Sequence, residues 1–171
     1  MRTGRRLGVD VGAARVGVAT CDPGGVLATP LVTLERDLEG GQDVNDLLRL
    51  VVEHEAIEVV VGLPRSLDGT EGPAAEHVRQ WCDALRGALS SDDALRDTPI
   101  RLVDERLTTV DAHRGLRDSG VAGRRHRGVV DQAAAVLILQ TALDTERATG
   151  RPPGERVGRP RRRTPRKGND A

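Results

Sequence analysis

The sequence predicts an α/β fold: a mixed sheet, made of an antiparallel three-strand meander plus parallel strands, with helices on both faces. Two short apolar runs surround a tight turn in RRLGVDVGAARVGVATCD, and a third run, GVLATPLVTL, follows at residues 25–34. These runs predict the meander. After them, helical and strand patterns alternate, as when a crossover helix leads into a parallel strand. A sheet covered on both faces accommodates this order.

The first crossover is predicted from periodicity. In residues 42–55, QDVNDLLRLVVEHE, the aliphatic side chains fall on one helical face, and IEVVVGLP follows as a fully buried strand. The loop RSLDGTEGP then leads into a helix that we expect to start near Pro73 and to run to about residue 90, with Thr70 as its cap.

A second strand and two helical patterns complete the predicted domain. The strand is IRLVDE, at residues 100–105, and a helical pattern runs from Thr108 or Thr109 to Asp118. The loop GVAGRRHRG separates this pattern from a last helix, VVDQAAAVLILQTALDTERA, which is strongly apolar on one side. We expect that helix to begin near Asp131.

Length and charge predict one domain and a tail. The 171 residues fit one domain at 1–150, whose core must be aliphatic because the chain has no Phe or Tyr and one Trp. Residues 151–171 carry a net charge of +6, which leaves −6 on residues 1–150 because the whole chain is neutral. With so few apolar residues, segment 151–171 is expected to be a disordered basic tail.

Other features argue against a secreted or membrane protein. Cys21 and Cys82 have neither metal nor redox spacing, and the N-terminus lacks the apolar run of a signal peptide. The longest apolar run, AAAVLIL, is far shorter than the roughly 20 residues of a membrane span. We expect a cytoplasmic protein with free thiols and no membrane role.

Acidic residues stand at positions where ionised carboxylates are unusual. Asp10 lies within the first apolar strand, Asp104 and Glu105 lie at the carboxyl end of a buried strand, and Asp131 begins the apolar last helix. If that helix crosses the strand of Asp10, these carboxylates converge and repel one another unless cations lie between them. Mg²⁺ prefers such oxygen ligands, and two ions about 4 Å apart stabilise an in-line phosphoryl displacement.

Each acid taken alone also has a structural explanation. Asp10 could accept hydrogen bonds from the turn GAAR, and Asp104 could cap the turn that follows it. Glu105 could pair with Arg106, and Asp131 could stabilise the start of its helix. Composition and spacing leave these explanations open beside the metal site.

Four segments together resemble a known family. LGVDVGAARVGVA, VVVGLPRSLDGTEGP, VDERLTT and VDQAAAVLILQ have the order and spacing of the YqgF family, also called RuvX, over roughly residues 6–145. These proteins are regarded as nucleases of precursor 16S ribosomal RNA and are related to Holliday junction resolvases. The resemblance implies a ribonuclease H-like fold and hydrolysis of phosphodiester bonds in structured RNA, with processing of the 5′ end of that precursor in ribosome biogenesis.

The resemblance also implies the site residues. The family's metal ligands map onto Asp10, Glu105 and Asp131, which would be catalytic and would together bind two ions of Mg²⁺ or Mn²⁺. Of the adjacent acids Asp104 and Glu105, Asp104 is the less favoured ligand. Possible substrate contacts are Arg65, Arg106, Thr108 and Thr109. Guanidinium groups suit phosphate oxygens, but each of these arginines could equally form a surface ion pair.

Three other functions compete with the RNA nuclease. A Holliday junction resolvase acting on branched DNA is the nearest, and a stable homodimer rather than a monomer would favour it. A non-catalytic nucleic-acid-binding module is disfavoured because all three acids are present. An actin-like kinase or ATPase needs a second lobe, for which a domain of this length leaves no room.

Overall fold

The computed structural model describes residues 1–108 and 124–158, and within them the predicted mixed sheet is confirmed. The strand order is β3-β2-β1-β4-β5-β6. The strands are β1 (Arg6–Val11), β2 (Arg15–Cys21), β3 (Ala28–Glu35), β4 (Glu58–Leu63), β5 (Ile100–Asp104) and β6 (Glu155–Arg156). Strands β1, β2 and β3 form the antiparallel meander, whereas β4 runs parallel to both β1 and β5.

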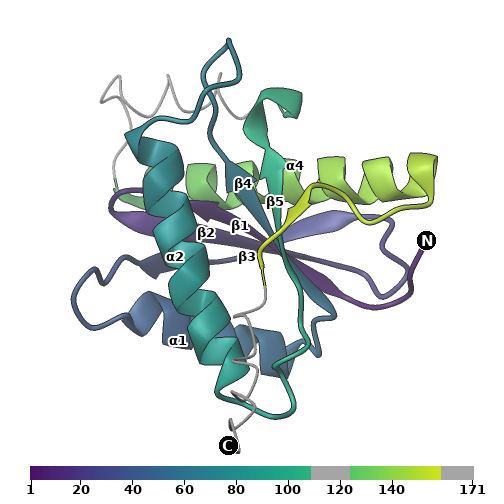
Figure 1. Cartoon of the computed structure of the whole chain (residues 1–171), viewed down its shortest axis with the longest axis horizontal. Helices are drawn as coiled ribbons and strands as arrows, with labels where there is room; N and C mark the ends of the chain where they lie inside the picture. The colour runs from purple at the N-terminus through teal and green to yellow at the C-terminus, as the bar shows by residue number, and fades with distance from the viewer. Residues whose placement is uncertain (109–123, 159–171) are drawn as a thin grey trace, which may run out of the picture.

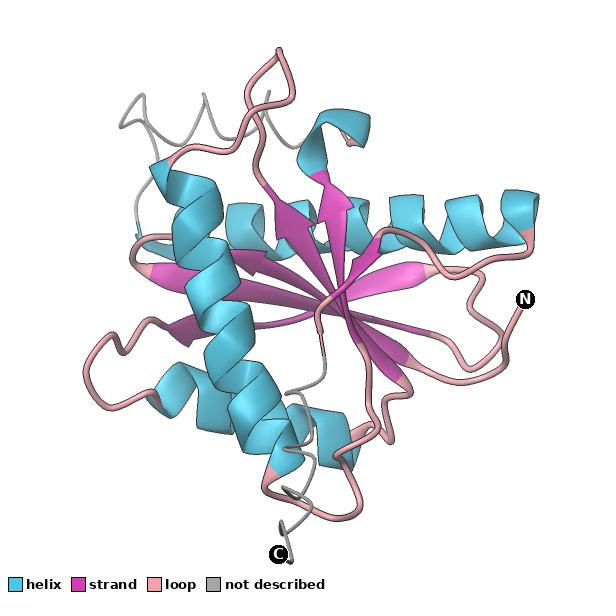
Figure 2. Cartoon of the chain, viewed as in Figure 1, coloured by secondary structure: helices cyan, strands magenta, loops and turns pink. Residues whose placement is uncertain are grey.

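Helices cover both faces of this sheet (Figure 1, Figure 2). Helices α1 (Gln42–Glu53) and α2 (Pro73–Ser90) pack together on one face, and α4 (Arg124–Thr149) crosses the other. A short 3-10 turn, η1 (Glu105–Leu107), follows β5. Neither these helices nor any other described one has the length and apolar character that a membrane crossing requires.

The alternation of side chains along each strand divides the core into two layers. Leu7, Val9 and Trp81 belong to the layer under α1 and α2. Val60 and Leu139 belong to the layer under α4. Both cysteines are buried and free, as expected.

Helix α4 lies unusually close to β1 because a glycine faces it. A Cβ atom placed on Gly8 would lie 2.5 Å from the Cβ of Leu139 and 2.8 Å from the carbonyl oxygen of Ala135. Only a residue without a side chain allows this approach. The close contact holds the helix against β1, and α4 also packs on β2 and β3.

A network of ion pairs forms around two buried carboxylates, Glu58 and Glu146, at the amino end of β1 and β4. Arg2 contacts Glu58 at 2.8 Å and Glu146 at 2.9 Å, while Arg101 contacts Glu58 at 2.8 Å. Arg6 lies 3.3 Å from Glu146. The hydrogen bonds from Arg2 lower the pKa of the Glu146 carboxyl to about 2, so this carboxylate is held ionised.

The predicted span of α2, from near Pro73 to about residue 90, is confirmed, but the prediction that Thr70 caps it is wrong. Helix α2 begins with Gly72 as its N-cap, in an extended conformation and with no side-chain cap, because Pro73 supplies the first helical residue. Thr70 instead bonds the Asp68 carboxylate through its backbone N–H and its hydroxyl, at 2.9 and 2.7 Å. The Asp68 side chain thus stabilises the loop, and Thr70 does not cap the helix.

The last helix begins earlier than expected, at Arg124 rather than near Asp131. The loop prediction relied on glycines, but Gly128 lies within the helix, where its carbonyl accepts a 2.9 Å hydrogen bond from the Thr33 hydroxyl. A single interior glycine costs about 1 kcal/mol, which a long helix tolerates. The predicted helical pattern from Thr109 to Asp118 falls outside the described residues.

The sheet continues past residue 150, where the sequence placed the end of the domain. Residues 155–156 form β6, which pairs with β5 in the register Arg101 with Arg156 and Leu102 with Glu155. The Val157 N–H also donates to the Ile100 carbonyl at 2.9 Å. The open edge of β5 needs such partners for its backbone groups, so the chain after α4 returns to the sheet.

Candidate active site

Asp10 lies near the carboxyl end of β1 with a glycine on each neighbouring strand. It is 1% exposed and stands opposite Gly17 of β2. On its other side, the β1–β4 register pairs Val9 with Val61, so Gly62 is the next residue along β4 beside Asp10. By strand alternation, Asp10 shares the α4 face with Gly8. The row Gly17, Asp10 and Gly62 therefore presents a single side chain to α4.

Glu105 lies over one of these glycines. It is the first residue of η1, directly after β5, and it is fully buried. A Cβ atom on Gly62 would lie 2.6 Å from Glu105 Oε1 and 2.5 Å from Ile138 Cδ1. The missing side chain of Gly62 is therefore the space that the Glu105 carboxylate uses, on the same face as Asp10.

Asp131 lies over the other glycine. It is two turns into α4 and 4% exposed, so it does not stabilise the start of its helix, as one sequence-based explanation held. A Cβ atom on Gly17 would overlap the Asp131 carbonyl oxygen and lie 3.1 Å from Asp131 Cβ. The Nε–H of Arg15 donates to Asp131 Oδ2 at 2.9 Å.

The three predicted acids thus lie around one row of the sheet. Asp131 and Glu105 lie over the strands on either side of Asp10, and neighbouring strands are only about 4.8 Å apart. Their donor set, carboxylate oxygens alone, suits a hard divalent cation, and the glycines let Glu105 and α4 approach the strands beside Asp10. As arranged in the described part of the chain, no three His, Cys, Asp or Glu side chains already form a metal-binding group.

Asp104 is engaged in a different interaction. Its carboxylate accepts a 3.0 Å hydrogen bond from the Arg106 backbone N–H and contacts the Arg106 guanidinium at 2.5 Å. The hydrogen bond from the Arg106 side chain lowers the pKa of Asp104. The prediction that Asp104 caps the following turn is confirmed. Arg106 pairs with Asp104, so the proposed Glu105–Arg106 pair is not what the structure contains.

The predicted substrate contacts lie at the same edge of the sheet. Arg65 is 3.2 Å from Glu71 and 4.0 Å from Asp104, so both it and Arg106 form ion pairs with acids of this edge. The Thr108 hydroxyl donates to the Glu105 carbonyl at 2.7 Å and stabilises the turn that presents Glu105. Thr109 lies outside the described residues.

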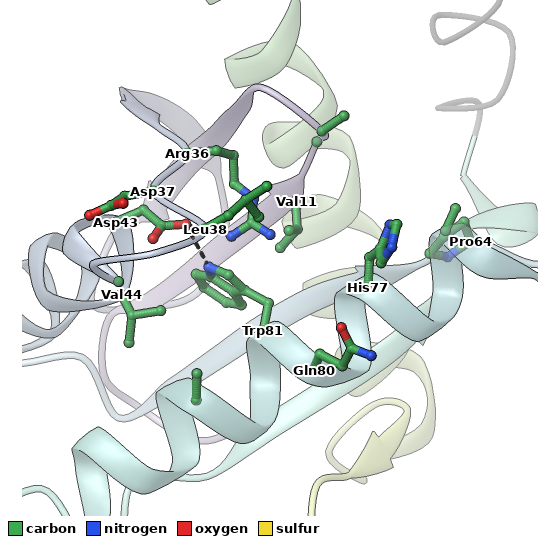
Figure 3. Close-up of a pocket in the computed structure, with 15 residues that line it drawn as sticks. Val11, Arg36, Asp37, Leu38, Asp43, Val44, Pro64, His77, Gln80 and Trp81 are labelled. Atoms are coloured by element: carbon green, nitrogen blue, oxygen red, sulfur yellow. Dashed lines mark hydrogen bonds and ion pairs between the residues drawn. The ribbon is translucent and has the colours of Figure 1, made fainter.

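A separate pocket opens on the other face of the sheet (Figure 3). It has a volume of about 610 Å³ and is bounded by the β1–β2 turn, the segment between β3 and α1, and α2. Beside it, Asp43 accepts hydrogen bonds from Trp81 Nε1 at 3.0 Å and from Arg36 at 2.7 Å. Val11 lines this pocket, and Asp10 faces the opposite side, so the acidic row does not belong to it.

Three residues of the site were given no defined role by the sequence-based hypothesis, although Gly62 lies in one of the motifs that carry the family resemblance. Gly17 and Gly62 admit Asp131 and Glu105, and Arg15 contacts Asp131. A glycine inside a strand indicates close approach by another segment, and this signal was present in both strands. Nothing in the sequence indicated which carboxylate Arg15 would contact.

A mixed sheet of this order, with helices on both faces, defines the chain as a protein of the ribonuclease H-like fold. Its structure is similar to that of RuvC from Thermus thermophilus in complex with a Holliday junction substrate, with a TM-score of 0.57 and 15% identity over 88% of this chain and 99% of that one. At that identity the likeness concerns the fold.

Sequence comparisons identify the family. The protein-family model described as "RuvX: Holliday junction resolvase" matches residues 4–145. A Streptomyces coelicolor protein named "Putative pre-16S rRNA nuclease" is 57% identical over 158 residues, which cover 92% of this chain and 90% of that protein. A Nocardioides protein of the same name is 53% identical, covering 92% and 98%. The chain belongs to the RuvX family, so the resemblance seen in the sequence is confirmed.

Proposed function

We propose that this protein is a metal-dependent nuclease that hydrolyses phosphodiester bonds in structured RNA, with precursor 16S ribosomal RNA as its substrate in the cytoplasm. The observation that carries the proposal is the placement of Asp10, Glu105 and Asp131, all buried, around one row of the sheet. Membership of the RuvX family and the names of its relatives support the substrate.

The three carboxylates would hold Mg²⁺ or Mn²⁺ at the carboxyl edge. Two such ions, when bound, stabilise the attacking and leaving oxygens of an in-line displacement. The protein supplies the acids, and the glycines let Glu105 and α4 lie close to the strands beside Asp10. Arg65 and Arg106, at the same edge, are our candidates for phosphate contacts, since a guanidinium can exchange a surface carboxylate for a phosphate. Thr108 and Thr109 remain candidates beside them.

Cleavage of branched DNA is the second candidate, because the matching family model is described as a Holliday junction resolvase. A resolvase cuts two strands related by symmetry, so that activity would require a two-fold dimer with paired sites. An RNA-processing enzyme could act as a monomer.

The test compares three substrates: precursor 16S RNA, a four-way DNA junction and linear duplexes, each with Mg²⁺, with Mn²⁺ or with a chelator. We expect metal-dependent cleavage of the RNA, lost in Asp10→Asn and retained in Asp83→Asn, which changes an exposed aspartate of α2. Preferred cutting of the junction would favour the resolvase. Absence of cleavage of every substrate by the wild type would contradict a nuclease.

A further inference from the structure

Arg15 is a largely buried cation directed at one of the acids of the site. It is the first residue of β2, and strand alternation puts it on the same face as Gly17, two residues further along. Its Nε lies 2.9 Å from Asp131 Oδ2, and the side chains of Arg15 and Asp131 are only 22% and 5% exposed. Little water screens this pair, so the charge of Arg15 acts strongly on Asp131.

The contact has a direct consequence for cation binding. A carboxylate oxygen that accepts a hydrogen bond from a guanidinium has less free electron density for another cation, and the two positive charges repel each other. Arg15 and a divalent ion would therefore compete for Asp131. Without an ion, the guanidinium reduces the repulsion among the three acids, which is the role that a metal would otherwise fill.

We propose that Arg15 is a positioning residue that acts as a substitute cation: it holds Asp131 in the metal-free protein and gives this carboxylate up when a divalent ion binds. The proposal rests on the metal site of the proposed function. It predicts that Arg15 sets the metal concentration at which the site fills. A purely structural ion pair would stabilise the fold without lowering the affinity for metal.

Mn²⁺ binding to the whole protein, measured from the free-ion electron paramagnetic resonance signal, tests this proposal. We expect Arg15→Gln to bind Mn²⁺ roughly tenfold more tightly than the wild type, the size of change expected when one nearby positive charge is removed. Arg15→Lys keeps the positive charge, so its affinity for Mn²⁺ should stay closer to that of the wild type. Arg106→Gln is the matched control. It removes the same charge from this edge of the sheet, but Arg106 contacts Asp104 and not Asp131.

The wild-type protein provides a second measurement that does not depend on a variant folding. The Nε–H resonance of Arg15 should shift in the NMR spectrum as Mg²⁺ is added, because the hydrogen bond to Asp131 is exchanged for water. Unchanged or weaker Mn²⁺ affinity in folded Arg15→Gln, or an Nε–H signal that ignores Mg²⁺ while the metal binds, would overturn the role of Arg15 alone. A wild type that binds neither ion would overturn the metal site as well.

Discussion

Substitution of Gly62 by alanine should separate activity from folding. The added Cβ would lie 2.6 Å from Glu105 Oε1 and 2.5 Å from Ile138 Cδ1, both shorter than carbon or oxygen atoms tolerate. Both atoms are the ends of side chains, so the fold can adjust without moving a strand. The Glu105 carboxylate, fully buried, must then leave the position beside Asp10.

The expected magnitudes follow from this geometry. Inserting a methyl group into a packed core costs about 1–3 kcal/mol, and for a chain of this size each 1 kcal/mol lowers Tm by roughly 2–4 °C. A catalytic group displaced by about 1 Å costs on the order of 100-fold in rate. Gly62→Ala should therefore remain folded, with a modestly lower Tm, and lose about two orders of magnitude of kcat.

Thermal unfolding and metal-dependent cleavage of precursor RNA are the two assays. The matched control is Gly87→Ala in α2, where an added Cβ meets nothing within 4 Å. That change should raise stability by about 0.5–1 kcal/mol, because alanine favours the helix, and should leave cleavage unchanged. Full activity in a folded Gly62→Ala protein would refute the placement of Glu105 in the site.

Four further predictions use other residues. Asp10→Asn should abolish cleavage and lose the gain in Tm that Mg²⁺ gives the wild type; continued cleavage by this variant would contradict the ligand assignment. Glu105→Gln should reduce kcat far more than Asp104→Asn, since Asp104 is held by Arg106, and equal losses in folded proteins would contradict that distinction. The pKa of Glu146 is lowered to about 2 from an ordinary 4.5. Its ion pairs therefore contribute fully to the free energy of unfolding above pH 4.5, and this contribution is lost as the pH falls toward 2. Unfolding free energy measured over that range should therefore fall by up to about 3 kcal/mol more in the wild type than in Glu146→Gln, and parallel curves would exclude this contribution. Removal of residues 159–171, which carry six Arg or Lys, should flatten the slope of log RNA affinity against log salt by roughly 4, and an unchanged slope would show that they do not contact RNA.

The sequence predicted the sheet well because its signals were local. Apolar alternation marked β1 and β2, and the helical pattern before IEVVVGLP indicated a crossover into a parallel strand, which is β4. The errors came from competition between local signals and tertiary contacts. Glycines indicated a loop before Asp131, yet packing against β3 extends α4 back to Arg124, and the open edge of β5 recruits residues 155–156.

The acids of the site illustrate what remained beyond sequence reasoning. Spacing brought Asp10 in β1 and Glu105 after β5 to the carboxyl edge of the sheet, but it did not establish that both face α4. Which face the acids share depends on Gly17 and Gly62, the neighbours of Asp10 on β2 and β4. Because these residues have no side chains, α4 and Glu105 can approach the strand backbone closely on the α4 face of the sheet. The glycines and the acids are therefore one feature. A side chain at Gly62 would take the space of the Glu105 carboxylate, and one at Gly17 would push away the α4 backbone that carries Asp131, so these acids lie beside the row of Asp10 because its neighbours have no side chains.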